Sequence, residues 1–140
     1  MAASNPYNNY KEQAIMTMTP GELIIVLYEE CIKMLNHAVF YIEEKNDLDE
    51  ADKAIRKAQR IIHYLDGILD YKYEIASNLH MLYDYFIRTL VQANIRKRVE
   101  VLKPIIPMLS ELKDSRGNLG VVLERRPQCA VSHEVRRRGQ

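Results

Sequence analysis

The sequence contains no tryptophan, only two phenylalanines and only two cysteines among its 140 residues. Two cysteines without a Cys-x-x-Cys spacing exclude a disulfide framework and indicate a reducing compartment. Glycine and proline number five each, which excludes a collagen-like chain. The longest apolar run, Leu23–Tyr28, is far shorter than the ~20 residues that cross a bilayer.

The N-terminus also lacks the basic cluster and apolar region of a secretory leader. What the sequence does contain is 47% apolar residues, enough for one domain with a single core. We therefore expect a soluble, cytoplasmic domain without membrane insertion.

Charge is distributed unevenly behind a net charge of +1. Residues 1–114 carry 14 Lys and Arg against 17 Asp and Glu, whereas residues 115–140 carry six Arg against two Glu. An acidic body does not attract nucleic acid, and Arg136–Arg138 is a short run without aromatic residues. We expect no nucleic-acid partner. The basic tail has three interpretations: a solvated disordered end, an RNA- or phosphate-binding arm, or a non-native extension.

The first helix is predicted from Thr19 to about Lys45. Thr19-Pro20-Gly21-Glu22 combines a capping hydroxyl, a proline in the first turn and a returning glutamate. Apolar residues then recur with the helical period, but Leu23–Tyr28 is apolar on every side. This segment is therefore either enclosed by several neighbours or offers a surface to a partner.

Periodicity predicts three further helices. The second runs from about Asp49 to Asp70 and the third from about Tyr73 to Asn94. The fourth contains Pro104 and Pro107, so we expect it to be short, or to bend or restart near Pro104. Short connections between such helices favour antiparallel neighbours.

The predicted fold is all-α: an antiparallel up-and-down four-helix bundle formed by residues 19–114. Residues 1–18 are too apolar for a free end, so we expect them to pack alongside the bundle as a cover segment. Residues 115–140 share no periodicity with the bundle and are predicted to form an irregular or disordered basic tail.

Motifs for catalysis or metal binding are missing. No histidine follows a glutamate by three residues, as bundle metal sites require, and no Gly-x-Ser-x-Gly, P-loop or dinucleotide-binding motif is present. Asp66 and Asp70 are predicted to be solvated, and Cys31 falls on an apolar stripe, which indicates a buried, inert thiol. We expect a protein that is not an enzyme and holds no cofactor or metal.

Nine tyrosines are the unusual feature of the composition. Tyrosine suits surfaces that are apolar on one side and wet on the other, including partner-binding surfaces. Met34, Met81 and Met108 fit either a core or an adaptable groove. Most of the tyrosines fit the boundary layer of a bundle, but a partner surface is the alternative for Tyr7, Tyr10, Tyr28, Tyr83 and Tyr85.

Several motifs keep their order and separation over residues 5–114. They are Asn5-Pro6-Tyr7 with Tyr10, Thr19-Pro20-Gly21-Glu22-Leu23, Leu27-Tyr28, Ile55, Lys57-Ala58-Gln59, Ile61-Ile62, Leu65, Leu69, Asn78-Leu79, Leu82-Tyr83-Asp84-Tyr85, Arg88, Leu90 and Gln92-Ala93-Asn94. Together they resemble the flagellin-specific export chaperones, the FliS family. The sequence departs from the family in lacking the tryptophan that usually closes its last helix, in Pro104 and Pro107, and in residues 116–140.

The resemblance implies a cytosolic chaperone for the disordered C-terminal segment of flagellin, which prevents premature polymerisation and aids type III export. It also suggests an export-gate protein and an anti-sigma factor as partners, and we expect a monomer or a weak dimer. Residues 1–18 are hypothesised to cover the groove that the client needs. The expected client-binding residues are Tyr7, Tyr10, Ile15, Leu23, Leu27, Tyr28, Leu79, Tyr83, Tyr85 and Asn94.

Three other functions remain open at this point. They are a metal-carrying bundle, a nucleic-acid-associated bundle that acts through the arginine tail, and a bundle that associates with itself through Leu23–Tyr28.

Overall fold

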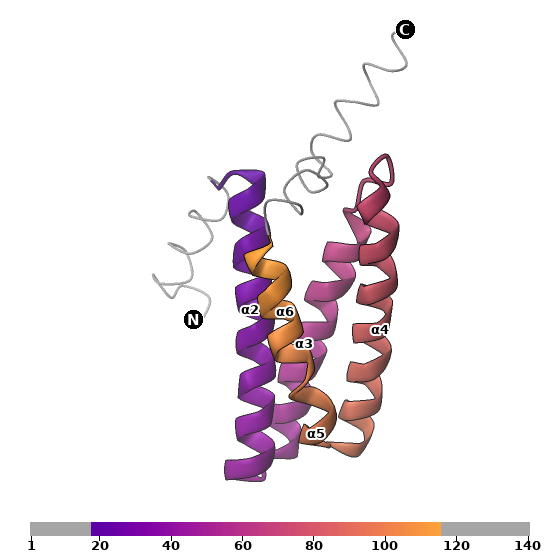
Figure 1. The fold of residues 1–140 in the computed structure, drawn as a ribbon. Coiled ribbons are helices and arrows are strands. Elements are labelled where there is room, and N and C mark those ends of the chain that lie inside the picture. Colours follow the sequence, from indigo (N-terminus) through magenta and orange to yellow (C-terminus); the bar gives the residue numbers. More distant parts are fainter. Residues whose placement is uncertain (1–17, 116–140) are drawn as a thin grey trace, which may run out of the picture.

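The computed structural model describes residues 18–115. Within this part of the chain, helices lie side by side in an antiparallel bundle (Figure 1). Helix α2 spans Pro20–Phe40 and continues as the π-helical turn η2, Tyr41–Lys45; α3 spans Leu48–Gly67 and α4 spans Glu74–Arg96. The short α5, Val99–Leu102, precedes α6, Ile105–Asp114. The predicted all-α bundle is confirmed, and residues 1–17 and 116–140, with the predicted cover segment and tail, lie outside the described residues.

The capping prediction for α2 is confirmed. The Glu22 amide donates to the Thr19 hydroxyl at 3.2 Å, and the Glu22 carboxylate accepts from the Thr19 amide at 2.9 Å. The helix ends at Asn46, which adopts the left-handed conformation with φ 51°. Asparagine tolerates this conformation better than most residues, and it reverses the chain into α3.

The second helix is shorter than predicted. It ends at Gly67, although Ile68 and Leu69 beyond its end are still buried. The apolar pattern correctly predicted that Ile68 and Leu69 are buried, but it did not predict the end of the helix, because a residue can be buried without being helical. Helix α4 extends two residues past the predicted Asn94, to Arg96.

The fourth segment breaks where proline predicts. Helix α5 ends at Leu102, and Pro104 is the cap residue that precedes α6. Pro107 lies in the first turn of α6, where a missing amide hydrogen costs little because those amides have no partner within the helix. The last segment is thus a short helix followed by a restarted one.

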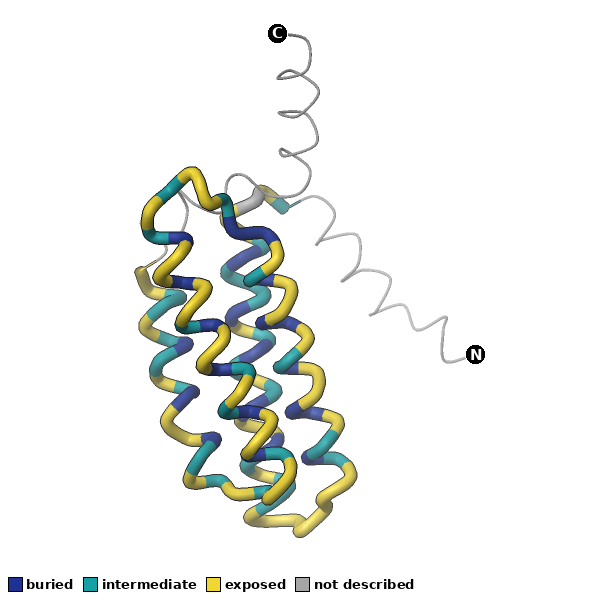
Figure 2. Tube along the Cα trace, turned by 90° about the vertical axis from the view of Figure 1, so that its right-hand side faces the viewer, coloured by how far each residue is buried: buried dark blue, intermediate teal, exposed yellow. Residues whose placement is uncertain are grey.

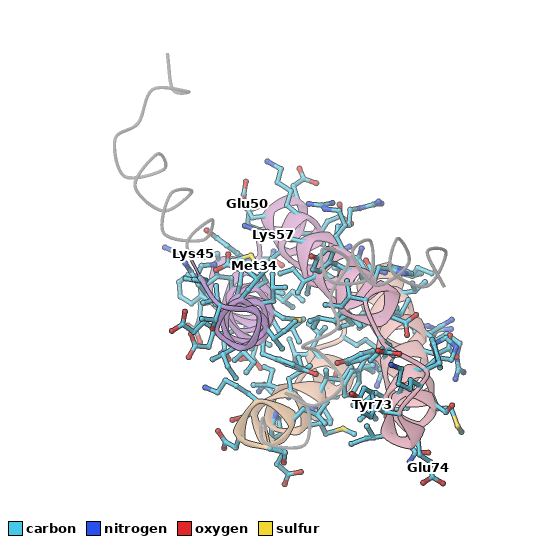
Figure 3. All side chains as sticks on the ribbon, turned by 90° about the horizontal axis from the view of Figure 1, so that it is seen from above. Met34, Lys45, Glu50, Lys57, Tyr73 and Glu74 are labelled. Carbon is cyan, nitrogen blue, oxygen red and sulfur yellow. The ribbon has the colours of Figure 1, made fainter. Side chains whose placement is uncertain are left out.

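The helices surround one apolar core, which appears as the inward dark blue segments of Figure 2. Helix α2 packs closely against both α3 and α6, while α4 packs against α3 and α5. Seen along the bundle in Figure 3, Met34 lies on the α2 side that faces α3. The largest fully buried side chains are Tyr28, Tyr83, Phe86, Ile24, Leu35, Ile55, Ile62, Leu65, Leu90, Leu102, Ile105 and Leu109.

Candidate functional site: partner-binding surface

The first turns of α2, which are apolar on every side, are partly enclosed by neighbouring helices and partly exposed. Ile24 and Tyr28 are buried, while Leu23, Ile25, Val26 and Leu27 are each half-buried. Packing of α2 against both α3 and α6 explains why so much of this segment is covered. We call the four half-buried residues the α2 apolar band, since they keep apolar surface in contact with water.

Tyr28 and Tyr83 lie in the core and do not line a surface. Both have no exposed area, and their hydroxyl groups form a hydrogen bond with each other between α2 and α4. Burial is the main cause that raises the pKa of both hydroxyls, in Tyr83 to about 12. Leu79 is 4% exposed in the same core. These three expected client contacts are therefore core residues in this conformation, and they lie beneath the surface of the bundle.

The other predicted contacts lie at separate places. Leu23 and Leu27 belong to the α2 apolar band, whereas Tyr85 is 44% exposed on α4. Asn94 is half-buried and its side-chain amide donates to the Asp52 carboxylate of α3 at 2.8 Å. Tyr7, Tyr10 and Ile15 lie outside the described residues. The structure therefore brings Leu23 and Leu27 together on one helix but does not join all the predicted contacts into one site.

The Asn94 side chain ties α4 to the beginning of α3. Its hydrogen bond is the largest cause that lowers the pKa of Asp52 from its usual value. The side-chain amide oxygen of Asn94, Oδ1, is buried and has no hydrogen-bond partner in the described part of the chain. Near it, the Lys97 ammonium donates to the Asn94 carbonyl at 2.6 Å. Asn94 thus acts first as a link between helices.

A second polar link joins α3 and α4 at the opposite end of these helices. The His80 ring lies 2.7 Å from the Asp66 carboxylate, and Tyr71 packs edge-on against that ring. The hydrogen bond to Asp66 is the main cause that raises the pKa of His80. Asp66 therefore has a structural partner and is half-buried, which differs from the predicted solvated carboxylate.

The part of the chain that the structure describes contains no cluster of side chains suited to a metal ion. Within residues 18–115, no group of three or more His, Cys, Asp or Glu side chains lies close enough to hold a metal ion. Cys31 is fully buried as predicted, and burial raises the pKa of its thiol to about 12. No helix in this part of the chain is long and apolar enough to span a membrane.

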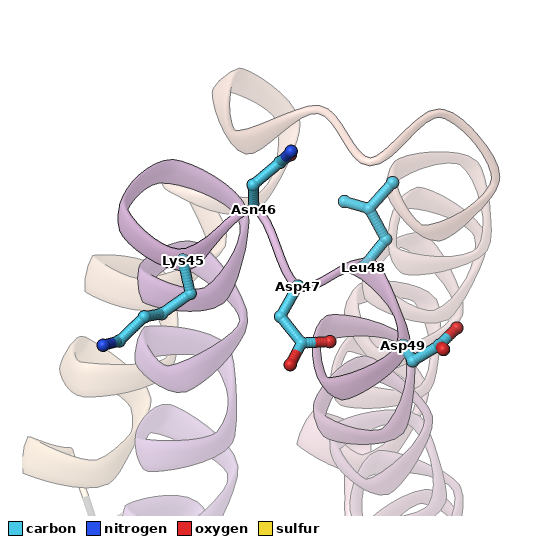
Figure 4. Close-up of a pocket in the computed structure, with 5 residues that line it drawn as sticks. All are labelled: Lys45, Asn46, Asp47, Leu48 and Asp49. Atoms are coloured by element: carbon cyan, nitrogen blue, oxygen red, sulfur yellow. The ribbon is translucent and has the colours of Figure 1, made fainter.

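A hollow at the turn between η2 and α3 is lined by Lys45, Asn46, Asp47, Leu48 and Asp49 (Figure 4). All five residues are exposed. The Asp47 carboxylate accepts from the Glu50 amide at 3.1 Å and so caps α3. The hollow is therefore explained by the turn between η2 and α3 and by the cap of α3, and no ligand is needed to account for it.

Helix α4 also carries exposed apolar residues: Val91 and Ile95 were not among the expected partner contacts, and Met81 was expected in either a core or an adaptable groove. Met81 and Ile95 are 69% and 72% exposed, and Val91 is 39% exposed. The sequence carried a signal for two of them, because Met81 and Ile95 are two seven-residue repeats apart and therefore share the side of α4 opposite its buried residues.

Comparisons with known proteins identify a family and several relatives of this chain. A family model described as "Flagellar protein FliS" matches residues 3–115. The flagellar secretion chaperone FliS of Bacillus subtilis (strain 168) is 35% identical over 115 residues, covering 82% of this chain and 86% of that protein. The protein of the same name from Salmonella typhimurium (strain LT2) is 35% identical over 107 residues, covering 74% and 78%. That of Escherichia coli K12 is 26% identical over 106 residues, with the same coverage.

Proposed function

Because the chain belongs to the FliS family of flagellar secretion chaperones, we propose that it binds the disordered C-terminal segment of flagellin in the cytoplasm. In this role it prevents premature polymerisation of flagellin and aids its type III export. The observation that carries the proposal is the 35% identity over 82% of the chain to a protein named as a flagellar secretion chaperone. An export-gate protein and an anti-sigma factor are further proposed partners.

The physical basis is exchange of apolar surface. A client with amphipathic helices buries their apolar faces in the filament, so a chaperone must offer those faces another apolar surface. Ordering the disordered client costs about 2–5 kcal/mol, which the buried surface has to offset. The α2 apolar band supplies such surface next to the buried layer of Ile24 and Tyr28. We assign client contacts to Leu23, Leu27, Tyr85 and Asn94 within the described residues, with Tyr28, Leu79 and Tyr83 as the packed layer beneath.

Calorimetric titration of the full chain with the C-terminal segment of its flagellin tests the proposal. We expect saturable binding, and Leu23→Ala and Tyr85→Ala should each weaken it about fivefold or more, as interface anchors do. Leu48→Ala and Phe40→Ala remove apolar side chains elsewhere that are as exposed as that of Tyr85, and they should leave affinity unchanged. Absence of binding to the intact chain would refute the function.

The same titration tests the covering role of residues 1–18. If this segment competes with the client, its deletion strengthens binding, while Thr19 and the cap of α2 remain in place. An unchanged dissociation constant would remove the covering role and leave the client assignment standing.

A further inference from the structure

Helices α4 and α6 share a strip of apolar surface toward the end of the bundle where the chain leaves α6. The strip consists of Ile75 and Leu82 of α4 and of Met108 and Leu112 of α6, which are each half-buried and pack on the core. The two helices run antiparallel, so the first turns of α4 and the last turns of α6 lie toward the same end (Figure 1). We call these four residues the α4–α6 apolar seam.

The neighbours of α4 and α6 leave this seam partly uncovered. On α4, His80 contacts Asp66 of α3, and the two seam residues lie about 140–160° around the helix from it, at ~100° per residue. On α6, Lys113 contacts Glu29 of α2, and the two seam residues lie about 100–140° away from it. Packing between α4 and α6 is slight, and their common neighbour α5 lies at the opposite end of α4. The seam therefore keeps apolar surface in contact with water that a further segment would bury.

Acidic side chains border the seam. Glu74 begins α4, and Glu111 and Asp114 lie in the last turns of α6; all three are exposed. They outnumber the basic Lys72 and Lys113 at this end, and Lys113 is already engaged by α2 at 3.7 Å. A segment that complements the seam is therefore apolar and carries positive charge.

Residues 116–140 of this chain have that chemistry. They carry six arginines against two glutamates, and the apolar run Val121-Val122-Leu123 is followed by Arg125 and Arg126. The run begins six residues after Ser115, the last described residue, so it can reach about 20 Å from the end of α6, at ~3.3–3.6 Å per residue. The seam extends only about 10 Å along α4, at a rise of ~1.5 Å per residue. The connection is therefore long enough for the run to lie on the seam.

We propose that residues 119–126 of the same chain dock on the α4–α6 apolar seam, with their apolar run against the seam and the arginines of the tail near the acids that border it. A segment held by a short linker has an effective concentration in the millimolar range, so weak contacts are sufficient for docking. The family model ends at residue 115, and the tail lies beyond it. This docking needs no client and is independent of the proposed function.

Amide NMR spectra of the full chain and of its Val122→Asp variant test the docking. Aspartate at this position would bury a charge against the apolar seam, so it should release the tail. We expect the amide signals of the four seam residues to shift, while those of the turn at Asn46–Asp49, at the opposite end of the bundle, stay in place. Val135→Asp makes the same change outside the docked segment and should leave the seam signals unchanged. Seam signals that are identical in the parent chain and in Val122→Asp overturn the proposal.

The rate of trypsin cleavage after Arg125 measures the charge pairing in the full chain. Glu111→Lys reverses a charge beside the seam and should speed this cleavage about two- to fivefold, as expected for a pair on exposed surface. Glu44→Lys, the same change at the opposite end of α2, should not, and circular dichroism establishes that both variants keep the fold. Equal cleavage rates in Glu111→Lys and the parent chain overturn the pairing. A rate that falls as protein concentration rises shows docking on a second copy and overturns docking within one chain.

Discussion

The hydrogen bond between Tyr28 and Tyr83 is the clearest feature at the scale of single residues. Both rings are fully buried, and the two residues lie 55 positions apart in the chain, on α2 and α4. Each hydroxyl needs the other, because a buried polar group without a partner costs free energy. Nearby, the Cys31 thiol lies 3.8 Å from the Ala58 carbonyl. These polar groups tie α2 to α4 and α3 inside an otherwise apolar core.

A double-mutant cycle measures the interaction energy between the Tyr28 and Tyr83 hydroxyl groups. We expect Tyr28→Phe alone to lower the free energy of unfolding by about 1–3 kcal/mol, because the Tyr83 hydroxyl is left unpaired. Tyr28→Phe combined with Tyr83→Phe should be less destabilised than the sum of the single changes, since both hydroxyls are then gone. Urea unfolding followed by circular dichroism gives the four free energies. Strictly additive effects would show that the hydrogen bond contributes nothing.

At the scale of elements, the helix ends are set by local chemistry. Thr19 and Asp47 cap α2 and α3 with side-chain oxygens, and Asn46 ends η2 in the left-handed conformation. Lys97 also adopts this conformation, with φ 53°, at the end of α4. Ion pairs on exposed surface, such as Lys103 with Glu43 at 2.9 Å, add little by comparison.

The cap of α2 predicts a measurable loss of stability. Thr19→Ala removes the acceptor for the Glu22 amide and should lower the free energy of unfolding by about 1 kcal/mol, within a range of ~0.5–2. Thr19→Ser keeps a hydroxyl in the same place and serves as the matched control, with stability close to that of the parent chain. Equal stability of the alanine and serine variants in urea would contradict the assigned role of the cap.

At the scale of the whole molecule, the buried acids couple folding to alkaline pH. The pKa values of Cys31 and Tyr83 rise to about 12 from ordinary values of 9.0 and 10.0, and that of Tyr28 rises as well. Their main cause is burial, which disfavours the charged form. The unfolded chain therefore releases these protons at a lower pH than the folded chain. As a result, the free energy of unfolding decreases at alkaline pH through the combined ionisation of Tyr28, Cys31 and Tyr83.

The stability that these three groups contribute should consequently be fully present below about pH 9 and fall as pH rises toward 12. Each group that ionises only in the unfolded chain lowers the free energy of unfolding by up to about 1.4 kcal/mol per pH unit. Urea midpoints measured between pH 7 and 11 follow this loss. The double variant Tyr28→Phe with Tyr83→Phe should show a shallower decline than the parent, and identical slopes would contradict the contribution of the pair.

Local patterns in the sequence were sufficient for the class of fold and for much of its layout. The period of apolar residues, the Thr19 box and the two prolines act through neighbours within one or two turns, so they can be read without tertiary contacts. They predicted the bundle, the beginning of α2 and the break before α6. The end of α3 was placed too late because Ile68 and Leu69 stay buried after the helix stops.

Tertiary structure alone decided which apolar residues remain accessible. Tyr28, Tyr83 and Tyr85 have the same side chain, but helix packing buries the first two against each other and leaves the third exposed. Likewise, Asp66 and Asn94 acquire partners from another helix. The sequence by itself determined the helices and the family, because both depend on order along the chain. The binding surface depends on which helix faces meet, and that is fixed only when the helices pack.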